Sequence, residues 1–474
     1  MDKRNLELLT DFYEFTMANG YFMKNMNNIA YFDIFFRKNP DDGGYSIFAG
    51  LEQIIDFVKS LHFTDEDINY LKNQNIFSDD FLNYLKDFKF TGDIWAVPEG
   101  TTVFPYEPLV TVRAPLYEAQ LLETMLLLLV NHESLIATKT RKIVNEANGR
   151  PVMEFGARRA HGADAAVYGA RAAIIGGAVS TSCTLTAQKF NVPSSGTMAH
   201  SWIQSFDNEY EAFKAYAEIY PNNCTFLIDT YDTLRSGLPN AIKVFDNVLK
   251  PQGIRPVAVR LDSGDLAYLS KEVRKILDEA GYSDCKICAT NALDEKLISS
   301  LLKQDAKIDI FGVGENLITS KSNPVFGAVY KLAAIEKDGV IIPKIKISEN
   351  VVKITNPSFK KVYRFYSKET GKALADIITL HDEEVLEGEY TIFDQENTWK
   401  RKTLSNYYVK PLLTKIFENG NLVYNSPSLK EIAEYSKNDL NTFWDEIKRL
   451  DNPHKYFVDL SQNLWNLKQE LLNR

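Results

Sequence analysis

The sequence predicts an α/β protein whose central region is a parallel β/α barrel. Between about residue 150 and residue 340, short apolar segments alternate with longer segments of helical periodicity. Repeated strand–helix units with uniformly apolar strands are typical of a buried parallel sheet. Five or more such units in succession favour a barrel over an open sheet. Each predicted strand ends in a group that could do chemistry or approach a ligand, and in a barrel these strand ends meet at one mouth.

Five apolar segments are the predicted strands of this central region, and a helix follows each of the first four. The strands are residues 152–155, 225–229, 256–260, 286–289 and 308–311. The helices are residues 163–175, about 240–249, 266–280 and 294–303. The last strand runs instead into a glycine-rich turn.

Two further regions are predicted on either side of the central one, which spans residues 150–340 and carries the active site. Residues 1–149 are predicted to form an N-terminal α/β domain, in which residues 116–148 are a long connecting helix. Residues 341–474 are predicted to contain strands and two closing helices, near 427–449 and 459–472.

Composition indicates a soluble, cytoplasmic protein. The chain has 474 residues, of which 45% are hydrophobic and 25% are charged, as in ordinary globular proteins. Its formal net charge of -9 argues against a nucleic-acid or membrane-surface binder, because both usually need a basic face. The charged first residues are followed by no apolar segment of signal-peptide length.

Cysteine usage fits the same environment. The four cysteines are Cys183, Cys224, Cys285 and Cys288, and none has partners at metal-ligand spacing. Because few unpatterned cysteines are typical of a reducing cytosol, we expect them to be free thiols.

The glycine-rich turn is a candidate anion site. Gly312 and Gly314 follow the last predicted strand, so several backbone N–H groups are free to point at a phosphate. Glycine also permits a positive φ and the close approach of a ligand. A plain tight turn is the alternative, but phosphate sites often lie in this loop of a barrel.

A second motif joins a cation to a carboxylate. Arg260 and Asp262 are two residues apart, so they share one face of a strand. A guanidinium plane can stack on an aromatic ring, and a carboxylate can accept hydrogen bonds from ribose hydroxyls. The alternatives are a simple ion pair, or Mg²⁺ held by Asp262 and Asp265 together with substrate phosphates.

Two further loops carry candidate residues. Arg158 and Arg159 follow the first strand and suit an anionic ligand, or else form an exposed pair. His200 ends a loop rich in Ser, Thr and Gly, where it is either a nucleophile or acid–base group or a structural histidine.

Five ordered motifs resemble those of the nicotinate phosphoribosyltransferase family. They span the chain from residue 8 to about residue 332, and residues beyond 345 contribute little to the resemblance. The motifs are LLTDFYEFTM at 8–17, EFGARR at 154–159, GTMAH at 196–200, RLDSGD at 260–265, and FGVG at 311–314 with SKSNPVFG at 320–327.

The resemblance implies a type II phosphoribosyltransferase fold. This fold is an irregular α/β barrel with a second α/β domain built from both chain ends, so the C-terminal segment packs back on the N-terminal domain. The resemblance also implies a homodimer with shared active sites. Tyr13 and Arg37 are then expected to reach the neighbouring subunit's site, where Tyr13 covers the nicotinate ring.

The resemblance also assigns substrate contacts within the central region. Phe155 and Arg260 are expected to sandwich the ring, with Thr197 beside it, while Asp262 holds the ribose. Three residues are expected to cradle the 5′-phosphate through their backbone: Gly312, Gly314 and Glu315. The remaining candidate substrate contacts are Arg158, Ser263, Gly264 and Asn291.

His200 matches the histidine that the family phosphorylates with ATP. The implied reaction converts nicotinate, phosphoribosyl pyrophosphate (PRPP), ATP and water into nicotinate mononucleotide, pyrophosphate, ADP and phosphate, a step of NAD biosynthesis. Mg²⁺ is expected to bind mainly through the phosphates of ATP and PRPP rather than in a protein metal site. His200, Arg260 and Asp262 are the expected catalytic residues.

Two departures from the family pattern bear on the substrate. Many relatives carry a small hydroxyl residue where Glu315 stands, and a carboxylate beside a phosphate is repulsive unless the backbone alone is used. The loop 178–181 contains no acidic residue, whereas nicotinamide-using relatives have an Asp there. Its absence favours a carboxylate substrate, which an Asp would repel.

The sequence also leaves other functions as alternatives. The nearest are a nicotinamide or a quinolinate phosphoribosyltransferase. A barrel isomerase or aldolase would need a lysine or a carboxylate base at a strand end, and lysine is missing from those positions. A non-enzymatic scaffold would show no saturable binding of PRPP.

Overall fold

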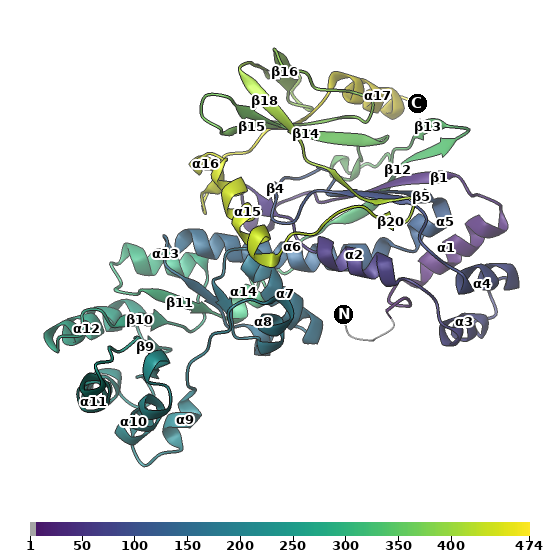
Figure 1. Cartoon of the computed structure of the whole chain (residues 1–474). Coiled ribbons are helices and arrows are strands. Elements are labelled where there is room, and N and C mark those ends of the chain that lie inside the picture. Colours follow the sequence, from purple (N-terminus) through teal and green to yellow (C-terminus); the bar gives the residue numbers. More distant parts are fainter. Residues whose placement is uncertain (1–5) are drawn as a thin grey trace. The chain divides into compact units, whose positions relative to one another are not determined.

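Two units make up the chain in the computed structural model, which describes residues 6–474 (Figure 1). Unit 1 comprises the described residues up to Leu135 together with Val325–Arg474, and unit 2 comprises Ile136–Pro324. Residues 1–5, on which the expected lack of a signal peptide partly rests, lie outside the described residues.

Unit 2 contains a six-stranded sheet in which all neighbouring strands are parallel, in the order β7-β6-β11-β10-β9-β8. Its strands are β6 (Val152–Glu154), β7 (Ser180–Thr181), β8 (Thr225–Leu227), β9 (Ala258–Leu261), β10 (Lys286–Ala289) and β11 (Ile310–Val313). The predicted parallel α/β architecture is therefore confirmed. Sequence analysis missed β7, which is two residues long and polar.

Closure of this sheet into a barrel is not confirmed. β7 and β8 are its two edges, and no backbone pairing joins them within residues 6–474. The chain between these edges forms helices instead of a closing strand. These helices are α8 (Thr184–Phe190), α9 (His200–Gln204) and α10 (Glu209–Ile219).

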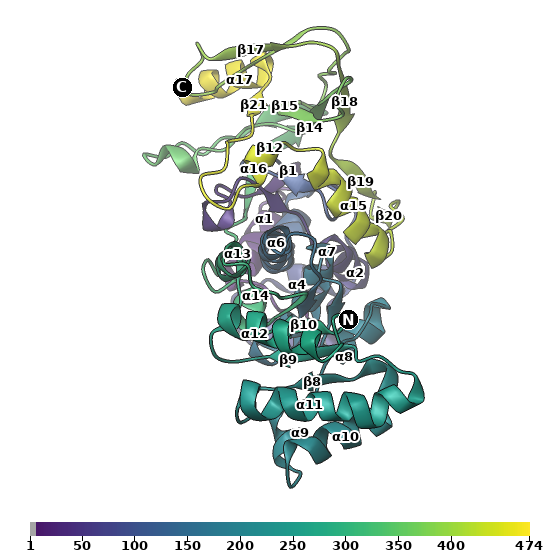
Figure 2. The same ribbon diagram turned by 90° about the vertical axis from the view of Figure 1, so that its left-hand side faces the viewer.

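The remaining helices of unit 2 each follow a strand, and all but the last, which comes after the glycine-rich turn, were predicted from the sequence. They are α7 (Ala163–Ile175), α11 (Leu238–Val244), α12 (Leu266–Glu279), α13 (Glu295–Lys303) and α14 (Glu315–Ile318). Figure 2 shows α9, α10 and α11 gathered beside β8. The side chain of Asp265 accepts a hydrogen bond from Tyr268 N at 3.0 Å, and this N-cap begins α12 directly after the Arg260 motif.

Unit 1 is built on a seven-stranded antiparallel sheet in the order β13-β12-β1-β5-β3-β19-β20. Its strands are β1 (Ile29–Phe35), β3 (Asp93–Ala96), β5 (Val110–Pro115), β12 (Val329–Lys337), β13 (Val340–Pro343), β19 (Thr414–Glu418) and β20 (Asn421–Leu422). Strands from distant parts of the chain thus pair side by side in this sheet.

Two groups of helices belong to this region of the chain. The N-terminal ones are α1 (Phe12–Met23), α2 (Leu51–Ser60), α3 (Asp65–Lys72), α4 (Asp79–Lys86), α5 (Leu116–Gln120) and α6 (Glu123–Glu146). The C-terminal ones are α15 (Leu429–Asn441), α16 (Asp445–Lys448) and α17 (Gln462–Leu472). The helix predicted at 116–148 is thus two helices, and α6 continues from unit 1 into unit 2. None of the helices within residues 6–474 is long and apolar enough to cross a membrane.

Smaller sheets complete unit 1. A four-stranded sheet has the order β18-β14-β15-β21, and two two-stranded antiparallel sheets pair β2 with β4 and β16 with β17. The strands are β2 (Ser46–Ile47), β4 (Thr102–Val103), β14 (Lys360–Ser367), β15 (Ala373–Leu380), β16 (Tyr390–Phe393), β17 (Arg401–Leu404), β18 (Tyr407–Pro411) and β21 (Val458–Leu460).

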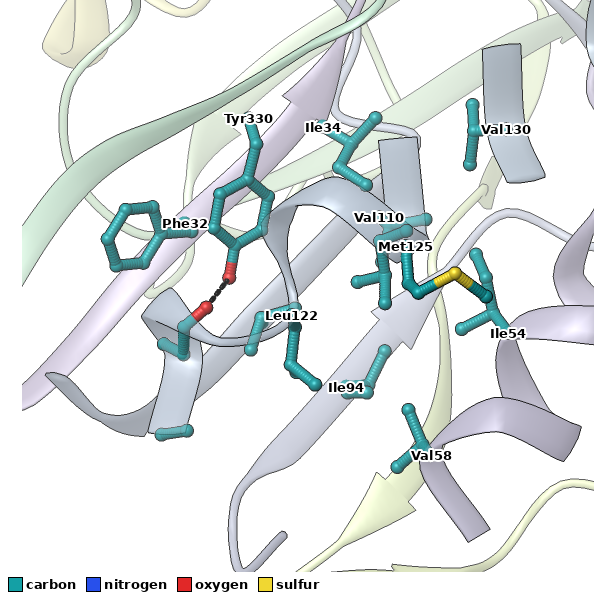
Figure 3. Packing of buried hydrophobic residues seen from close by; sticks show 14 of the residues in the cluster. Phe32, Ile34, Ile54, Val58, Ile94, Val110, Leu122, Met125, Val130 and Tyr330 are labelled. Atoms are coloured by element: carbon teal, nitrogen blue, oxygen red, sulfur yellow. Dashed lines mark hydrogen bonds between the residues drawn. The ribbon is translucent and has the colours of Figure 1, made fainter. Parts of the chain in front are cut away.

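Aromatic and aliphatic side chains fill the core beneath the seven-stranded sheet (Figure 3). The rings of Phe32 and Tyr330 stack with their centroids 4.6 Å apart. The hydroxyl of Tyr330 donates to the carbonyl oxygen of Ala119 at 2.8 Å, so this buried polar group is satisfied (Figure 3).

A buried ion network lies in the C-terminal part of unit 1. Arg364 and Asp376 are fully buried, and Nη2 of Arg364 lies 2.7 Å from Asp376 Oδ2. The same guanidinium lies 3.6 Å from Asp439, and Tyr456 OH donates to Asp376 at 2.9 Å. These groups come from β14, β15, α15 and the segment before β21, so the network as a whole joins four parts of the chain.

We predict that Arg364→Met destabilises the protein by about 3–5 kcal/mol, because two buried carboxylates lose their cation. Chemical denaturation measures the change in the free energy of unfolding. The control is Arg449→Ala, whose guanidinium is 55% exposed and lies 3.8 Å from Glu446. That change is expected to cost less than about 1 kcal/mol. Equal losses in the two variants would contradict the buried-network account.

Candidate functional site

Four strand ends in unit 2 bring the candidate residues together. β6, β11, β10 and β9 are consecutive neighbours in the parallel sheet, so their carboxyl ends lie along one edge. Phe155, Gly314, Thr290 and Asp262 follow these strands within two residues of their ends. Ligands of open parallel sheets bind outside the carboxyl ends of the strands.

Arg260 is the most constrained side chain at this edge. It lies in β9, is 12% exposed, and uses all three of its nitrogens. Nε donates to Thr290 Oγ1 at 2.9 Å, Nη1 to Thr197 Oγ1 at 2.7 Å, and Nη2 to Asp262 Oδ1 at 3.0 Å. Because the donors of a guanidinium are coplanar, these three bonds fix the orientation of its plane.

Asp262 carries the negative charge at this edge. Burial alone would raise its pKa, but the hydrogen bond from Thr290 and the charge of Arg260 outweigh burial and lower the pKa below its ordinary value. The backbone N–H of Asp262 donates to Asp229 Oδ2 at 3.0 Å, and the Ser263 hydroxyl donates to the same oxygen at 2.5 Å. The carboxylate of Asp262 is therefore ionised and fixed at neutral pH.

His200 comes from another element but reaches the same carboxylate. It is the first residue of α9, and its Nε2 lies 3.6 Å from Asp262 Oδ2. Its Nδ1 lies 3.1 Å from Thr230 Oγ1, just after β8. The imidazole is 40% exposed, so it faces both the ion pair and solvent.

Glycines give the 312–314 turn its close contacts. A Cβ on Gly312 would lie 2.7 Å from both Phe155 Cδ2 and Thr290 Cγ2, and one on Gly314 would lie 3.1 Å from the Phe155 carbonyl oxygen. Neither glycine has a positive φ. The expectation of a positive-φ turn here is therefore wrong, and the glycines are required by close packing against Phe155.

Glu315 begins α14, directly after this turn. Its carboxylate lies 2.7 Å from Lys321 Nζ and 3.8 Å from Arg159 Nε, and the hydrogen bond from Lys321 lowers its pKa. Two cations thus balance the negative charge of the Glu315 carboxylate. The backbone N–H of Glu315 is then the group that this residue adds to the turn.

The other predicted substrate-binding residues come from both units of the chain. Arg158 is exposed, Gly264 has a φ of +79°, and Asn291 is exposed with a φ of +83°. Tyr13 and Arg37 belong to unit 1, where Tyr13 is 43% exposed and Arg37 lies 5.6 Å from the centroid of the Phe35 ring. Burial and the nearby Glu123 raise the pKa of Tyr13, so it stays a neutral phenol.

Three residues of the site were not among the predicted site residues. Thr290 bridges Arg260 and Asp262, Thr230 contacts His200, and Asp229 fixes the backbone of Asp262. Each follows a strand end, which is the one signal that the sequence offers for them. Hydroxyl and carboxylate residues are common at such positions, so the signal does not single them out.

No preformed metal centre is present in the described part of the chain, where no group of three or more His, Cys, Asp or Glu residues could hold an ion. One oxygen of Asp265 caps α12. Asp229 Oδ1 is buried without a hydrogen-bond partner, next to Asp262. One or two such carboxylates fit an ion such as Mg²⁺ whose other ligands are phosphates and water.

Comparison with known proteins gives consistent matches over nearly the whole chain. Family models match as follows: the nicotinate phosphoribosyltransferase (NAPRTase) N-terminal domain at residues 8–131, the nicotinate phosphoribosyltransferase (NAPRTase) family at 151–386, and the nicotinate phosphoribosyltransferase C-terminal domain at 359–468. A nicotinate phosphoribosyltransferase of Bacillus subtilis is 45% identical over 471 residues, which cover 99% of this chain and 96% of that protein.

Two solved structures extend the comparison to the fold. The crystal structure of human nicotinic acid phosphoribosyltransferase matches with a TM-score of 0.87 and 29% identity, covering 98% of this chain and 99% of that one. A nicotinate-nucleotide pyrophosphorylase from Pyrococcus furiosus matches with a TM-score of 0.71 and 25% identity, covering 93% of this chain and 98% of that one.

We predict that Gly312→Ala destabilises the protein by about 1–3 kcal/mol, because the added methyl group displaces the ring of Phe155. Thermal and urea unfolding measure the change. The control is Gly20→Ala in α1, where an added Cβ meets nothing within 4 Å and removal of a helical glycine stabilises by up to about 1 kcal/mol. A Gly312→Ala protein as stable as the control would refute the packing argument.

Proposed function

The chain belongs to the nicotinate phosphoribosyltransferase family, and we propose that it transfers the phosphoribosyl group of PRPP to nicotinate, giving nicotinate mononucleotide and pyrophosphate. The observation that carries this proposal is the fixed plane of Arg260 beside an ionised Asp262, at the same strand edge as Phe155 and the 312–314 turn. Together these groups suit a substrate that combines a flat ring with a sugar phosphate.

The nicotinate ring lies between Phe155 and Arg260 in this proposal. The Phe155 ring packs against Gly312 and is oriented before the substrate arrives. Arg260 offers a flat cationic face, which favours a planar ring that carries a carboxylate. The Thr197 hydroxyl, already bonded to Arg260, lies beside the ring.

The sugar phosphate takes the neighbouring positions. Asp262, kept ionised by Arg260 and Thr290, accepts hydrogen bonds from the ribose hydroxyls. Three backbone positions cradle the 5′-phosphate: Gly312, Gly314 and Glu315. The cations beside the Glu315 carboxylate reduce its repulsion of the phosphate. The further substrate contacts are Arg158, Ser263, Gly264 and Asn291.

Phosphoribosyl transfer depends more on the placement of the two substrates than on acid–base catalysis. The lone pair of the pyridine nitrogen forms a bond to C1 of the ribose while the bond from C1 to the pyrophosphate oxygen breaks. Positive charge develops at C1, and fixed groups that hold the ring and sugar in line lower the barrier. No strong base is required, because the pyridine nitrogen carries no proton to remove.

ATP hydrolysis is coupled to this transfer through His200. A nitrogen of the imidazole attacks the γ-phosphorus of ATP, the bond from that phosphorus to the bridging oxygen breaks, and ADP leaves. The added charge orders the loops around the site. Water later cleaves the N–P bond, which releases phosphate and restores the free histidine. The position of His200 between Asp262 and Thr230, with 40% exposure, supports this role. Mg²⁺ would bind mainly through the phosphates of ATP and PRPP and would neutralise part of their charge, and Asp229, whose Oδ1 is buried without a hydrogen-bond partner, would be its candidate protein ligand.

The assembly in this proposal is a cytoplasmic homodimer with shared active sites. Tyr13 and Arg37 contribute to the site of the other subunit, which agrees with the 43% exposure of Tyr13. Four free thiols fit a reducing compartment. The net charge of -9 argues against nucleic-acid and membrane partners.

The parallel sheet forms an irregular barrel in this proposal. Ser194 pairs with Thr181 in β7, and the chain then runs to His200, whose ring contacts Thr230 after β8. Residues 194–200 therefore lead from one sheet edge to the other at the carboxyl ends, which supports closure by a loop in place of backbone pairing.

The base specificity of the enzyme tests the proposed function. We predict that the enzyme converts nicotinate to its mononucleotide and releases ADP. With nicotinamide, kcat/KM is expected to be at least about 100-fold lower. The reasons are that Arg260 favours a carboxylate and that the loop 178–181 has no acidic residue to accept a hydrogen bond from an amide. Quinolinate is the second control. Equal turnover with nicotinamide, or turnover with quinolinate without ADP release, would favour the alternative phosphoribosyltransferases. No turnover with any base would favour an isomerase, an aldolase or a scaffold.

We predict that His200→Ala abolishes coupling to ATP but leaves slow, ATP-independent synthesis. The stimulation by ATP, on the order of 10-fold, disappears because no phosphorylated histidine orders the site. Measuring ADP and nicotinate mononucleotide in parallel checks this outcome. His454→Ala, at an exposed histidine of unit 1, is the control and retains coupling. Unchanged ADP release per product in His200→Ala would remove His200 from the mechanism.

A further inference from the structure

Thr290 lies between the two charged side chains on which the proposed function depends. It directly follows β10, is 3% exposed, and its backbone N–H donates to the carbonyl oxygen of Leu261 at 2.9 Å. The residue thus continues the pairing of β10 with β9, which fixes its position relative to Arg260 and Asp262.

The hydroxyl of Thr290 links these two side chains. Its oxygen accepts from Arg260 Nε at 2.9 Å, and it donates its hydrogen to Asp262 Oδ1. The other acceptor in reach is the carbonyl oxygen of Leu261 at 3.3 Å. A carboxylate is the stronger acceptor, so the single hydrogen points to Asp262.

The hydrogen bond from Arg260 Nε to Thr290 constrains the guanidinium plane in a way that the bonds of Nη1 and Nη2 do not. Nη1 and Nη2 are bonded to Thr197 and Asp262, and Thr197 lies in the loop that precedes His200. Nε is the nitrogen nearest the strand, so its bond to Thr290 defines the guanidinium plane from the rigid side. Without the hydroxyl, a largely buried N–H has no acceptor, and the plane keeps only its bonds to Thr197 and Asp262, neither of which holds it from the side of β10.

The backbone that follows Thr290 is also constrained. Asn291 and Ala292 both have left-handed φ, at +83° and +43°, which non-glycine residues seldom adopt in succession. Asn316 Nδ2 donates to the carbonyl oxygen of Ala292 at 2.7 Å. Thr290 therefore stands at the start of a constrained turn and not in a loop that could follow a moving arginine.

We propose that Thr290 is a positioning residue for phosphoribosyl transfer: its hydroxyl fixes the Arg260 plane against the substrate ring and the Asp262 carboxylate at the ribose. Thr290 touches no reacting atom. The proposal rests on the proposed function, because Arg260 and Asp262 are its targets.

Thr290→Val and Thr290→Ser form a matched pair that tests this role. Valine keeps the methyl group that packs against Gly312 and removes the hydroxyl, whereas serine keeps the hydroxyl and removes the methyl. We expect Thr290→Val to lower kcat by about 10- to 100-fold, the range for a hydrogen bond to charged groups. KM for nicotinate is expected to rise as well, because a guanidinium plane that is no longer fixed must be ordered when the ring binds. Thr290→Ser stays within about 3-fold of the unmodified enzyme in kcat.

A spectroscopic measurement separates orientation from folding. In protein labelled with ¹⁵N-arginine, the Arg260 Nε–H signal is expected to resist exchange with water in the unmodified enzyme and in Thr290→Ser, and to be lost in Thr290→Val. Arg260→Lys assigns the signal. This readout decides the proposal even if Thr290→Val has a lower melting temperature.

Normal kcat in Thr290→Val would overturn the proposal. Losses in Thr290→Ser as large as those in Thr290→Val would also overturn it, because packing would then be the cause. A protected Arg260 signal in Thr290→Val would also overturn it. Failure of the proposed function would give a different result from failure of the Thr290 proposal, because the unmodified enzyme itself would make no nicotinate mononucleotide. The exchange measurement would still report on the hydrogen bond between Arg260 and Thr290.

Discussion

The orientation of one guanidinium plane is the constraint on which the site depends. Arg260 is anchored to Thr290, Thr197 and Asp262, so strands β9 and β10 and the loop before His200 share one rigid cation. A cation held this way is available to a flat anionic ring without the cost of first ordering its side chain. Thr290 and Arg260 also lower the pKa of Asp262 and keep it ionised, so in the proposed site recognition of the base is coupled to recognition of the sugar.

The parallel sheet makes that arrangement possible. Because β6, β11, β10 and β9 are neighbours and point the same way, residues far apart in the chain emerge at one edge. Close packing of Gly312 against Phe155 and Thr290 then ties the expected phosphate turn to the ring and to the ion pair. A change at any one of these positions is therefore expected to affect the others, and their effects should not be additive.

Local sequence predicted most of unit 2 and much of this site. Strand 286–289 and helix 163–175 match β10 and α7, because apolar runs and helical periodicity are local signals. The barrel that the sequence favoured is not confirmed, because closing a sheet depends on pairing between edge strands that are distant in sequence. β7 consists of Ser180 and Thr181 and carries no apolar signal. The role of Thr290 follows from three-dimensional contacts, as hydroxyl residues are ordinary at strand ends.

The most direct measurement is a crystal structure of the enzyme with nicotinate mononucleotide bound. The account predicts the pyridine ring between Phe155 and Arg260, the ribose hydroxyls at Asp262, and the phosphate on the backbone of Gly312 and Gly314. A nucleotide bound away from the carboxyl edge of the parallel sheet, or a ring that does not contact Arg260, would contradict it.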